Sequence, residues 1–211
     1  SCQRANRTNP DIYQYLLAEA QNIHQSDRES CRAIGEHGLE LVRKYPNVLT
    51  HCNAGSLAVS ELGTALAPIY IANEQGTNVH VFVDETRPLL QGARLTAFEL
   101  RRNGVPCTLI SDNMAAHIMS EGKIDMIITG ADRIAANGDA ANKIGTLSIA
   151  IAAKYFRIPF YIAVPLSTID YATNSGSDIL IEEREGAEVT HFGGVRIAPA
   201  GVSARSPAFD V

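Results

Sequence analysis

The sequence lacks the features of membrane-spanning and nucleic-acid-binding proteins. No apolar run approaches the roughly 18 to 20 residues that cross a bilayer, and the first residues have no apolar core of the secretory-signal type. The chain has 18 Lys and Arg against 23 Asp and Glu, a formal net charge of -5, and its basic residues form no cluster. We therefore expect neither a membrane nor a nucleic acid as partner.

Motifs for metals, disulfides and nucleotides are also missing. The four cysteines form no Cys-x-x-Cys pair, a spacing that favours free thiols in a reducing compartment, so we expect a cytoplasmic protein. Neither Gly-x-Gly-x-x-Gly nor Gly-x-x-x-x-Gly-Lys occurs, which disfavours dinucleotide and NTP binding, and no Gly-x-Ser-x-Gly supports a serine hydrolase. Asp132 and Asp139 have no histidine at ligand spacing, so no metal is expected.

The sequence does contain an alternation of strand-like and helix-like segments. A helical pattern over residues 11–44 ends at Tyr45-Pro46. Short β-prone runs follow at 48–51, 79–83, 108–111, 126–129 and 160–164, separated by helical patterns at 56–73, 92–103, 113–120 and 143–155. This alternation predicts an α/β fold with a doubly wound, mainly parallel, Rossmann-like sheet and helices on both faces. We divide the chain into a helical segment (1–46) and an α/β catalytic domain (47–211), with short strands or loops at 178–182 and 189–195.

Polar side chains follow each predicted strand. The five strands run into Cys52-Asn53, Asp84-Glu85, Asp112-Asn113, Asp132 and Ser167-Thr168. Strand ends need capping residues in any case, so one such set is weak evidence. If the sheet is parallel, however, all five sets meet at the edge where doubly wound sheets bind ligands. The pattern therefore favours an active site.

Two of these residues suit acid–base chemistry. Cys52 precedes a glycine-containing turn and a predicted helix start, which would lower its pKa, although most free cysteines are simply small buried apolar residues. Asp132 follows an apolar run, so we expect its carboxyl group to be poorly solvated, with a raised pKa. Two groups of different pKa can exchange protons with one substrate.

Three further residues suit an anionic group of the substrate. Gln91, Asn142 and Lys143 are the candidates, with Lys143 as the positive charge. Asn142 and Lys143 are placed at the start of the predicted helix 143–155, where free N–H groups would help to bind a phosphate. The alternatives are a capping loop and a solvated lysine, but a cation at a helix amino terminus is unfavourable without an anion nearby.

Several ordered motifs carry a family resemblance. These are Thr50-His51-Cys52-Asn53-Ala54-Gly55, the segment 84–96, Asp112-Asn113-Met114-Ala115, the segment 130–139, Asn142-Lys143-Ile144-Gly145-Thr146 and the segment 165–170. From about Leu17 to Val211 the chain closely resembles methylthioribose-1-phosphate isomerase, an enzyme of methionine salvage. The resemblance implies that Cys52 and Asp132 are the catalytic pair and that Gln91, Asn142 and Lys143 bind substrate. It also implies a homodimer without a cofactor.

The chain departs from the family at its amino-terminal side. Full-length members carry a further domain with an Arg-Gly-Ala segment that helps bind phosphate, and no Arg-Gly-Ala occurs here. We therefore expect the catalytic domain of a longer protein. The expected reaction converts 5-methylthioribose 1-phosphate to 5-methylthioribulose 1-phosphate, by proton abstraction or by hydride shift. Two alternatives stay open: an isomerase of another pentose 1-phosphate, such as ribose 1,5-bisphosphate or 5-deoxyribose 1-phosphate, and a non-catalytic, sugar-phosphate-sensing regulatory subunit of translation initiation.

Overall fold

The centre of the molecule is a five-stranded parallel sheet with the strand order β3-β2-β1-β4-β7. The computed structural model describes residues 9–211. The strands are β1 (Asn47–Thr50), β2 (His80–Asp84), β3 (Cys107–Ile110), β4 (Met126–Thr129) and β7 (Phe160–Ile162). The chain runs outward from β1 to β3 and then returns to place β4 on the other side of β1. The predicted doubly wound sheet is confirmed, and its topological switch point lies between β1 and β4.

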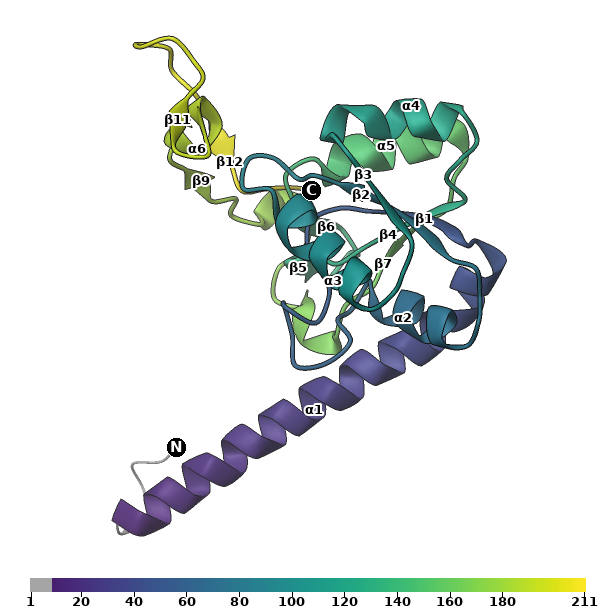
Figure 1. The fold of residues 1–211 in the computed structure, drawn as a ribbon. Helices are drawn as coiled ribbons and strands as arrows, with labels where there is room; N and C mark the ends of the chain where they lie inside the picture. The colour runs from purple at the N-terminus through teal and green to yellow at the C-terminus, as the bar shows by residue number, and fades with distance from the viewer. Residues whose placement is uncertain (1–8) are drawn as a thin grey trace.

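Helices cover both faces of this sheet (Figure 1). One face carries α1 (Asn9–Lys44), α2 (Ala67–Glu74) and α3 (Ala97–Arg102), and the other carries α4 (Ala115–Ser120) and α5 (Thr146–Phe156). Successive strand residues point to opposite faces, so Val48 and Met126 join the first core while Leu49 and Ile127 join the second. Because both faces are covered, these strands are apolar throughout.

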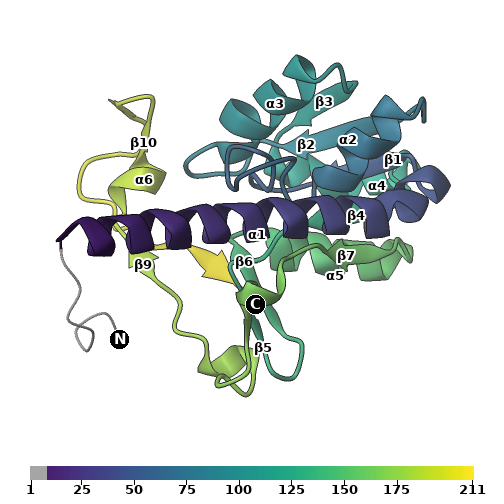
Figure 2. The same cartoon turned by 90° about the horizontal axis from the view of Figure 1, so that it is seen from below.

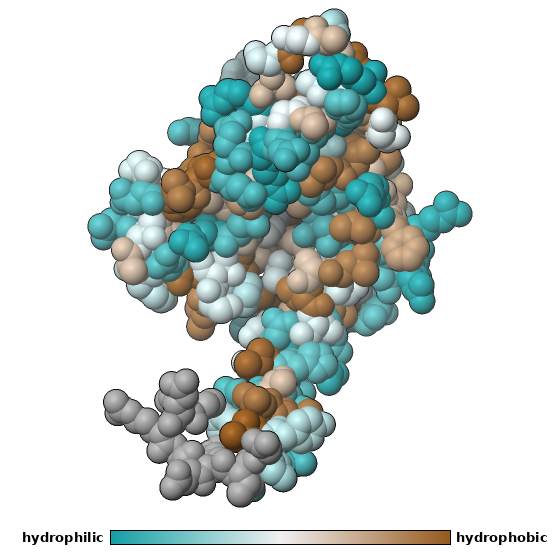
Figure 3. Space-filling view, turned by 90° about the vertical axis from the view of Figure 1, so that its left-hand side faces the viewer, coloured by the Kyte–Doolittle hydropathy of each residue, from teal (hydrophilic) through white to brown (hydrophobic). Residues whose placement is uncertain are grey.

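The long helix α1 is anchored only by its carboxyl-terminal part. Val42 is fully buried in the core beside α2, and Cys31 is also buried. The amino-terminal part extends beyond the sheet and its helices (Figures 1 and 2). Large side chains are exposed there, among them Tyr13, Leu16 and Ile23. In the space-filling view, hydrophobic surface is visible along this part of the molecule (Figure 3).

A second, smaller sheet lies beyond the carboxyl ends of the central strands, and the sequence did not predict it. It has the order β13-β6-β5-β8 and consists of β5 (Arg133–Ala135), β6 (Ala140–Lys143), β8 (Ile169–Asp170) and β13 (Phe209–Asp210). The predicted helix start at residue 143 is therefore wrong. Lys143 ends a strand, and α5 begins at Thr146. Strands this short carry no readable period-2 pattern.

The predicted helix over residues 56–73 is also shorter than expected. Residues 56–66 form turns, and only Ala67–Glu74 is helical. The π-helix η2 (Gly92–Thr96) runs directly into α3, and the 3₁₀ turn η3 (Asp112–Met114) precedes α4. The later part of the chain contains η4 (Leu166–Thr168), η5 (Gly176–Asp178), β9 (Glu183–Arg184), α6 (Ala187–Thr190), β10 (His191–Phe192), β11 (Val195–Arg196) and β12 (Ser206–Pro207). The expected strand or loop at 178–182 is mostly loop, and 189–195 covers all of the β10–β11 hairpin but its last residue, Arg196.

Candidate active site

A cavity of about 260 Å³ opens at the topological switch point, beyond the carboxyl ends of β1 and β4. Ligands of doubly wound sheets bind in this position. Cys52 and Asp132, which follow the two strands, both line the cavity, and so does Asn142 at the end of β6. The remaining lining is His51, Asn53, Ala54, Ala58, Val59, Thr64, Gly130, Ala131, Val164, Pro165 and Thr168.

Cys52 is half-buried and has an unusual backbone. Its φ is +63°, in the left-handed region that residues with a side chain rarely adopt. Burial raises the pKa of its thiol and the Asp132 carboxylate raises it further, while a backbone N–H at Asn53 and the Lys143 ammonium lower it. The predicted lowering of the pKa is therefore wrong, because turns rather than a helix start follow Cys52.

Asp132 directly follows the central sheet and belongs to a turn into β5. Its backbone N–H donates to the carbonyl oxygen of Ala141 at 2.9 Å. The residue as a whole is exposed, so the expected poor solvation is wrong for the isolated chain. Protein atoms packed around the carboxyl group still desolvate it enough to raise its pKa, as predicted, against the opposing charges of Lys143 and Arg184. The pKa of Asp132 is therefore shifted in the direction that favours a proton donor.

Lys143 is buried, with a relative exposure of 4%, and it makes no ion pair within the part of the chain that the structure describes. Desolvation lowers its pKa and nearby Arg184 adds to this, while Cys52, Glu188 and Asp132 oppose it. A buried ammonium without an ion pair is costly. An anionic ligand would relieve that cost.

The helix amino terminus near Lys143 is already capped by another residue. Both carboxylate oxygens of Asp210 accept hydrogen bonds there, from the backbone N–H groups of Gly145 at 2.7 Å and Leu147 at 2.9 Å. Two of the N–H groups on which the phosphate site was predicted are therefore already occupied by a carboxylate. Asn142 is buried and donates to the Thr146 hydroxyl at 3.0 Å.

Gln91, like Lys143, is a predicted site residue that does not line the cavity. Gln91 is half-buried just before η2. Its side-chain oxygen is buried and has no hydrogen-bond partner among the described residues. Cys52, Asp132 and Asn142 therefore share one cavity and Lys143 lies within electrostatic range, whereas Gln91 is not among the cavity's lining residues.

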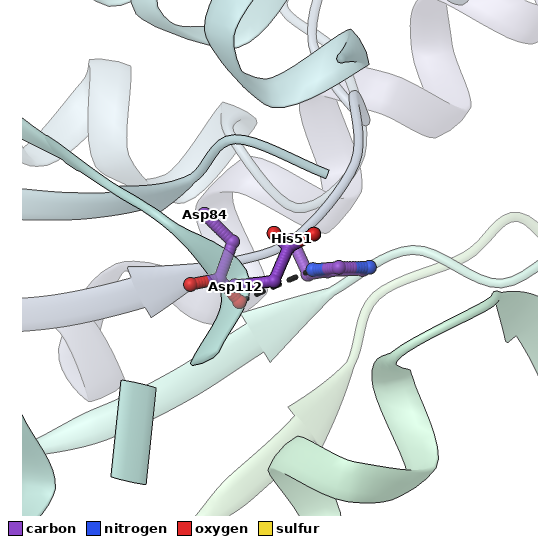
Figure 4. Close-up of side chains that lie close together, drawn as sticks. All are labelled: His51, Asp84 and Asp112. Atoms are coloured by element: carbon purple, nitrogen blue, oxygen red, sulfur yellow. Dashed lines mark hydrogen bonds and ion pairs between the residues drawn. The ribbon is translucent and has the colours of Figure 1, made fainter. Parts of the chain in front are cut away.

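Sequence patterns missed a buried pair, His51 and Asp84, of which His51 immediately precedes Cys52 in the chain (Figure 4). His51 Nδ1 lies 3.1 Å from Asp84 Oδ2, and His51 Nε2 lies 2.9 Å from the carbonyl oxygen of Ile144. Both ring nitrogens face acceptor oxygens, so both must carry a proton if both hydrogen bonds are to form. A neutral imidazole carries one such proton and a carboxylate carries none, so the pair needs one additional proton. Desolvation lowers the pKa of His51, but Asp84 and the Ile144 carbonyl raise it by more, so the pKa lies above its ordinary value. Desolvation raises the pKa of Asp84 to about 6 against the pull of His51.

Asp112 lies close to this pair and raises the question of a metal site (Figure 4). Side-chain ligand atoms of His51, Asp84 and Asp112 lie within 4.8 Å of one another. The two carboxylate oxygens of Asp112 accept backbone N–H groups, from Thr86 at 2.7 Å and Arg87 at 2.6 Å. A metal held by all three side chains would have to displace the hydrogen bonds of His51. The donor set therefore fits a structural hydrogen-bond network better than a metal centre.

A second missed residue is Glu99, a buried carboxylate on α3. It holds the loop after Cys52 by accepting hydrogen bonds from the Asn53 side chain, from the backbone and hydroxyl of Ser56, and from the Leu57 backbone. Tyr70 adds a further donor at 3.3 Å. A single glutamate inside a helical pattern gives no sequence signal for this role.

Comparison with known proteins agrees with the geometry. The sequence profile of the initiation factor 2 subunit family matches residues 3–211. The chain belongs to this family. It is 64% identical over 196 residues to a methylthioribose-1-phosphate isomerase of Chloroflexus aurantiacus, covering 93% of this chain and 56% of that protein. This chain thus spans little more than half the length of such relatives.

Two solved structures are similar to the whole chain. The 5-methylthioribose 1-phosphate isomerase from Pyrococcus horikoshii superposes with a TM-score of 0.93 at 45% identity, over 99% of this chain and 58% of that one. The translation initiation factor eIF-2B subunit delta from A. fulgidus superposes with a TM-score of 0.89 at 43% identity, over 95% and 58%. Within residues 9–211, no helix is long and apolar enough to cross a membrane.

Proposed function

We propose that this chain is the catalytic part of an aldose–ketose isomerase that converts 5-methylthioribose 1-phosphate to 5-methylthioribulose 1-phosphate in methionine salvage. The observation that carries the proposal is the placement of Cys52 and Asp132 on one cavity at the switch point of the sheet. The names of the relatives at 55–64% identity support the same substrate.

The reaction opens the furanose ring and moves hydrogen from C2 to C1. The ring oxygen gains a proton, the C2 hydroxyl loses one, and the substrate as a whole keeps its atoms. Asp132 supplies the proton to the ring oxygen and serves the developing carbonyl oxygen, and the upward shift of its pKa is in the direction that a proton donor needs. Cys52 acts on the C2 side. Either proton abstraction or a hydride shift is compatible with these roles.

Lys143 is the proposed anchor of the phosphate, since its buried ammonium has no ion pair in the described chain. Asn142, next to it on β6, and Gln91 complete the proposed binding set. The Gln91 side chain brings an unpartnered buried oxygen, so its amide has hydrogen-bonding capacity left. No cofactor is part of this proposal.

The cavity wall favours a methylthio group over a second phosphate at C5. Apolar side chains make up much of its lining, and neither Lys nor Arg is among the lining residues: Ala54, Ala58, Val59, Val164 and Pro165 are the apolar members. With Lys143 paired to the C1 phosphate, a C5 phosphate would be desolvated there without a second counter-charge. This argues against ribose 1,5-bisphosphate as the substrate. It does not separate 5-deoxyribose 1-phosphate, which has no phosphate at C5.

We propose further that the full-length protein is a cytoplasmic homodimer and that residues 1–46 link the catalytic domain, residues 47–211, to additional sequence. The exposed apolar side chains on the amino-terminal part of α1 support such a link. The pair Cys52 and Asp132 speaks against a purely regulatory subunit, because sensing a sugar phosphate does not require acid–base groups.

The test is turnover by the full-length protein on three sugar phosphates at equal concentration. We expect kcat/KM for 5-methylthioribose 1-phosphate to exceed that for 5-deoxyribose 1-phosphate by about 10-fold or more, the contribution of a buried methylthio group. Ribose 1,5-bisphosphate should be a poorer substrate still. Preference for the bisphosphate, or binding without turnover of all three, would contradict the proposed substrate or the enzymatic role.

A further inference from the structure

The backbone of Cys52 needs an external restraint. At φ +63° its Cβ is crowded against its own backbone, and such conformations persist only where the surroundings fix them. The loop that follows, residues 53–66, has no regular structure of its own that would impose this geometry. The restraint must therefore come from neighbouring elements.

Two buried threonine hydroxyls hold the two peptide groups of Cys52. The backbone N–H of Cys52 donates to Thr86 Oγ1 at 2.9 Å, and its carbonyl oxygen accepts from Thr96 Oγ1 at 2.6 Å. Both threonines are fully buried. Thr86 Oγ1 donates its own proton to the carbonyl oxygen of Asp84 at 3.1 Å, so the lone pairs of Oγ1 are available to accept the Cys52 N–H. Both threonine hydroxyl protons are therefore committed, one to Asp84 and the other to Cys52.

A glycine brings the two threonines to the same place. Thr86 follows β2, and Thr96 is the last residue of the π-helix η2. At Gly92, the first residue of η2, a Cβ atom would lie 1.7 Å from the Asp84 carbonyl oxygen and 2.8 Å from Thr86 Oγ1. Only glycine allows η2 to start against the end of β2. This close contact places Thr96 beside the end of β1.

We propose that Thr86 and Thr96 are positioning residues that hold Cys52 in its left-handed conformation and thereby direct its thiol into the cavity. The proposal rests on the proposed role of Cys52 in the isomerisation. Neither threonine lines the cavity, so both act through the Cys52 backbone. Without the Thr96 hydrogen bond the Cys52–Asn53 peptide is free to rotate toward the extended region. The thiol would then move away from Asp132 and Lys143.

The test compares Thr96→Val with Thr96→Ser in the full-length protein. Valine keeps the shape and loses the hydroxyl, whereas serine keeps the hydroxyl. We expect Thr96→Val to lower kcat at least about 10-fold with KM changed less than about 3-fold, because substrate binding is untouched. Thr96→Ser should stay within about 3-fold of wild type in kcat. A Thr96→Val enzyme with wild-type kcat would overturn the proposal.

Thr129→Val is the matched control. Thr129 is also fully buried at the end of a central strand, but its hydroxyl has no hydrogen-bond partner among the described residues. This variant should keep wild-type kcat and melting temperature or melt slightly higher. If Thr96→Val fails to fold, Thr86→Val tests the same restraint from the N–H side.

Two readouts separate this proposal from the isomerase assignment. The first is the rate at which iodoacetamide alkylates Cys52, followed by peptide mass mapping, which should fall at least about 3-fold in Thr96→Val as the thiol leaves the Lys143 ammonium. The second is thermal melting: Cys52→Gly should melt a few degrees above Cys52→Ala, because glycine adopts positive φ freely. A protein that shows both effects but turns over no pentose phosphate keeps the positioning role and loses the proposed function. Turnover with neither effect overturns the positioning role alone.

Discussion

At the residue scale, Cys52 and Asp132 face one cavity from two different central strands. Cys52→Ser and Asp132→Asn should each lower kcat by at least about 10³-fold with the fold intact, as expected for groups that act mainly in the transition state. Cys107→Ser, which removes a half-buried thiol outside the cavity, is the control and should be silent. A variant of the pair that keeps more than about a tenth of wild-type kcat would show that its residue has another role.

The raised pKa of Asp132 predicts the pH dependence of turnover. Desolvation favours the neutral carboxyl, so the acid that protonates the ring oxygen is kept to a higher pH than in an unperturbed aspartic acid. kcat should fall as pH rises through the pKa of Asp132 in the substrate complex. In the residual activity of Asp132→Asn this high-pH limb should be absent. A limb that persists unchanged in that variant would belong to another group.

Lys143 predicts the strength of phosphate anchoring. Lys143→Ala should weaken substrate binding by roughly 1.5 to 3 kcal/mol, the range for a lost charge-assisted hydrogen bond. Lys143→Met keeps an apolar side chain of similar length and should weaken binding similarly, which separates the charge from the packing. Lys123→Ala removes an exposed lysine paired with Glu121 and serves as the charge-matched control. Equal affinity of the Lys143 and Lys123 variants in a calorimetric titration would refute the anchor.

At the element scale, His51 ties the end of β1 to the connection between β6 and α5. Its Nε2 reaches the Ile144 carbonyl, and a Cβ at Gly145 would lie 3.0 Å from the imidazole ring, so glycine is required for this approach. Cys52 follows His51 and Lys143 precedes Ile144. One imidazole thus sets the spacing between two of the proposed site residues.

This link should make stability depend on pH. The folded pKa values of His51 and Asp84 are both raised, so the stability that they add is present at low pH and is lost as pH rises through the folded values. In urea unfolding, the contribution of His51 to the free energy of unfolding should decline above about pH 6.5, the pKa of an unfolded histidine. The total decline should be about 1.4 kcal/mol for each pKa unit by which the folded value exceeds the unfolded one. Asp84→Asn should flatten this decline. An equally steep decline in Asp84→Asn would assign it to other groups.

At the scale of the whole molecule, α5 presents an apolar stripe to solvent. Leu147, Ile151 and Tyr155 lie four residues apart on one helix face, with relative exposures of 43%, 63% and 79%. α5 lies beside β7, which ends the sheet with an unpaired edge in the described chain. An apolar helix face next to a free strand edge is typical of an interface between subunits.

We therefore expect the proposed homodimer to use this face. Ile151→Glu in the full-length protein should shift the sedimentation coefficient from dimer to monomer, because it buries a charge in the contact. Ile197→Glu places the same charge at a similarly exposed isoleucine near the β10–β11 hairpin and should leave the dimer intact. A dimer that survives Ile151→Glu would place the interface elsewhere.

The sequence by itself determined the central architecture. The apolar runs at residues 48–51, 79–83 and 126–129 and the helices between them are local patterns, and chain connectivity makes such an alternation a parallel sheet. With the sheet predicted, Cys52 and Asp132 could be placed on one edge, because the carboxyl ends of parallel strands meet there. The pairing of these two residues needed no knowledge of any side-chain contact.

Tertiary structure decided the features that depend on contacts between distant segments. The strand β6 pairs with β5 on one side and with the distant β13 on the other, and the pairing of Lys143 with Phe209 of β13 makes it a buried strand residue and not a helix-start residue. The pKa of Cys52 is raised because its surroundings bury it and no helix follows it, and its backbone conformation depends on hydroxyls contributed by the segment after β2 and by η2. Desolvation and long-range hydrogen bonds arise only when the chain is packed, so no local pattern of residues predicts them.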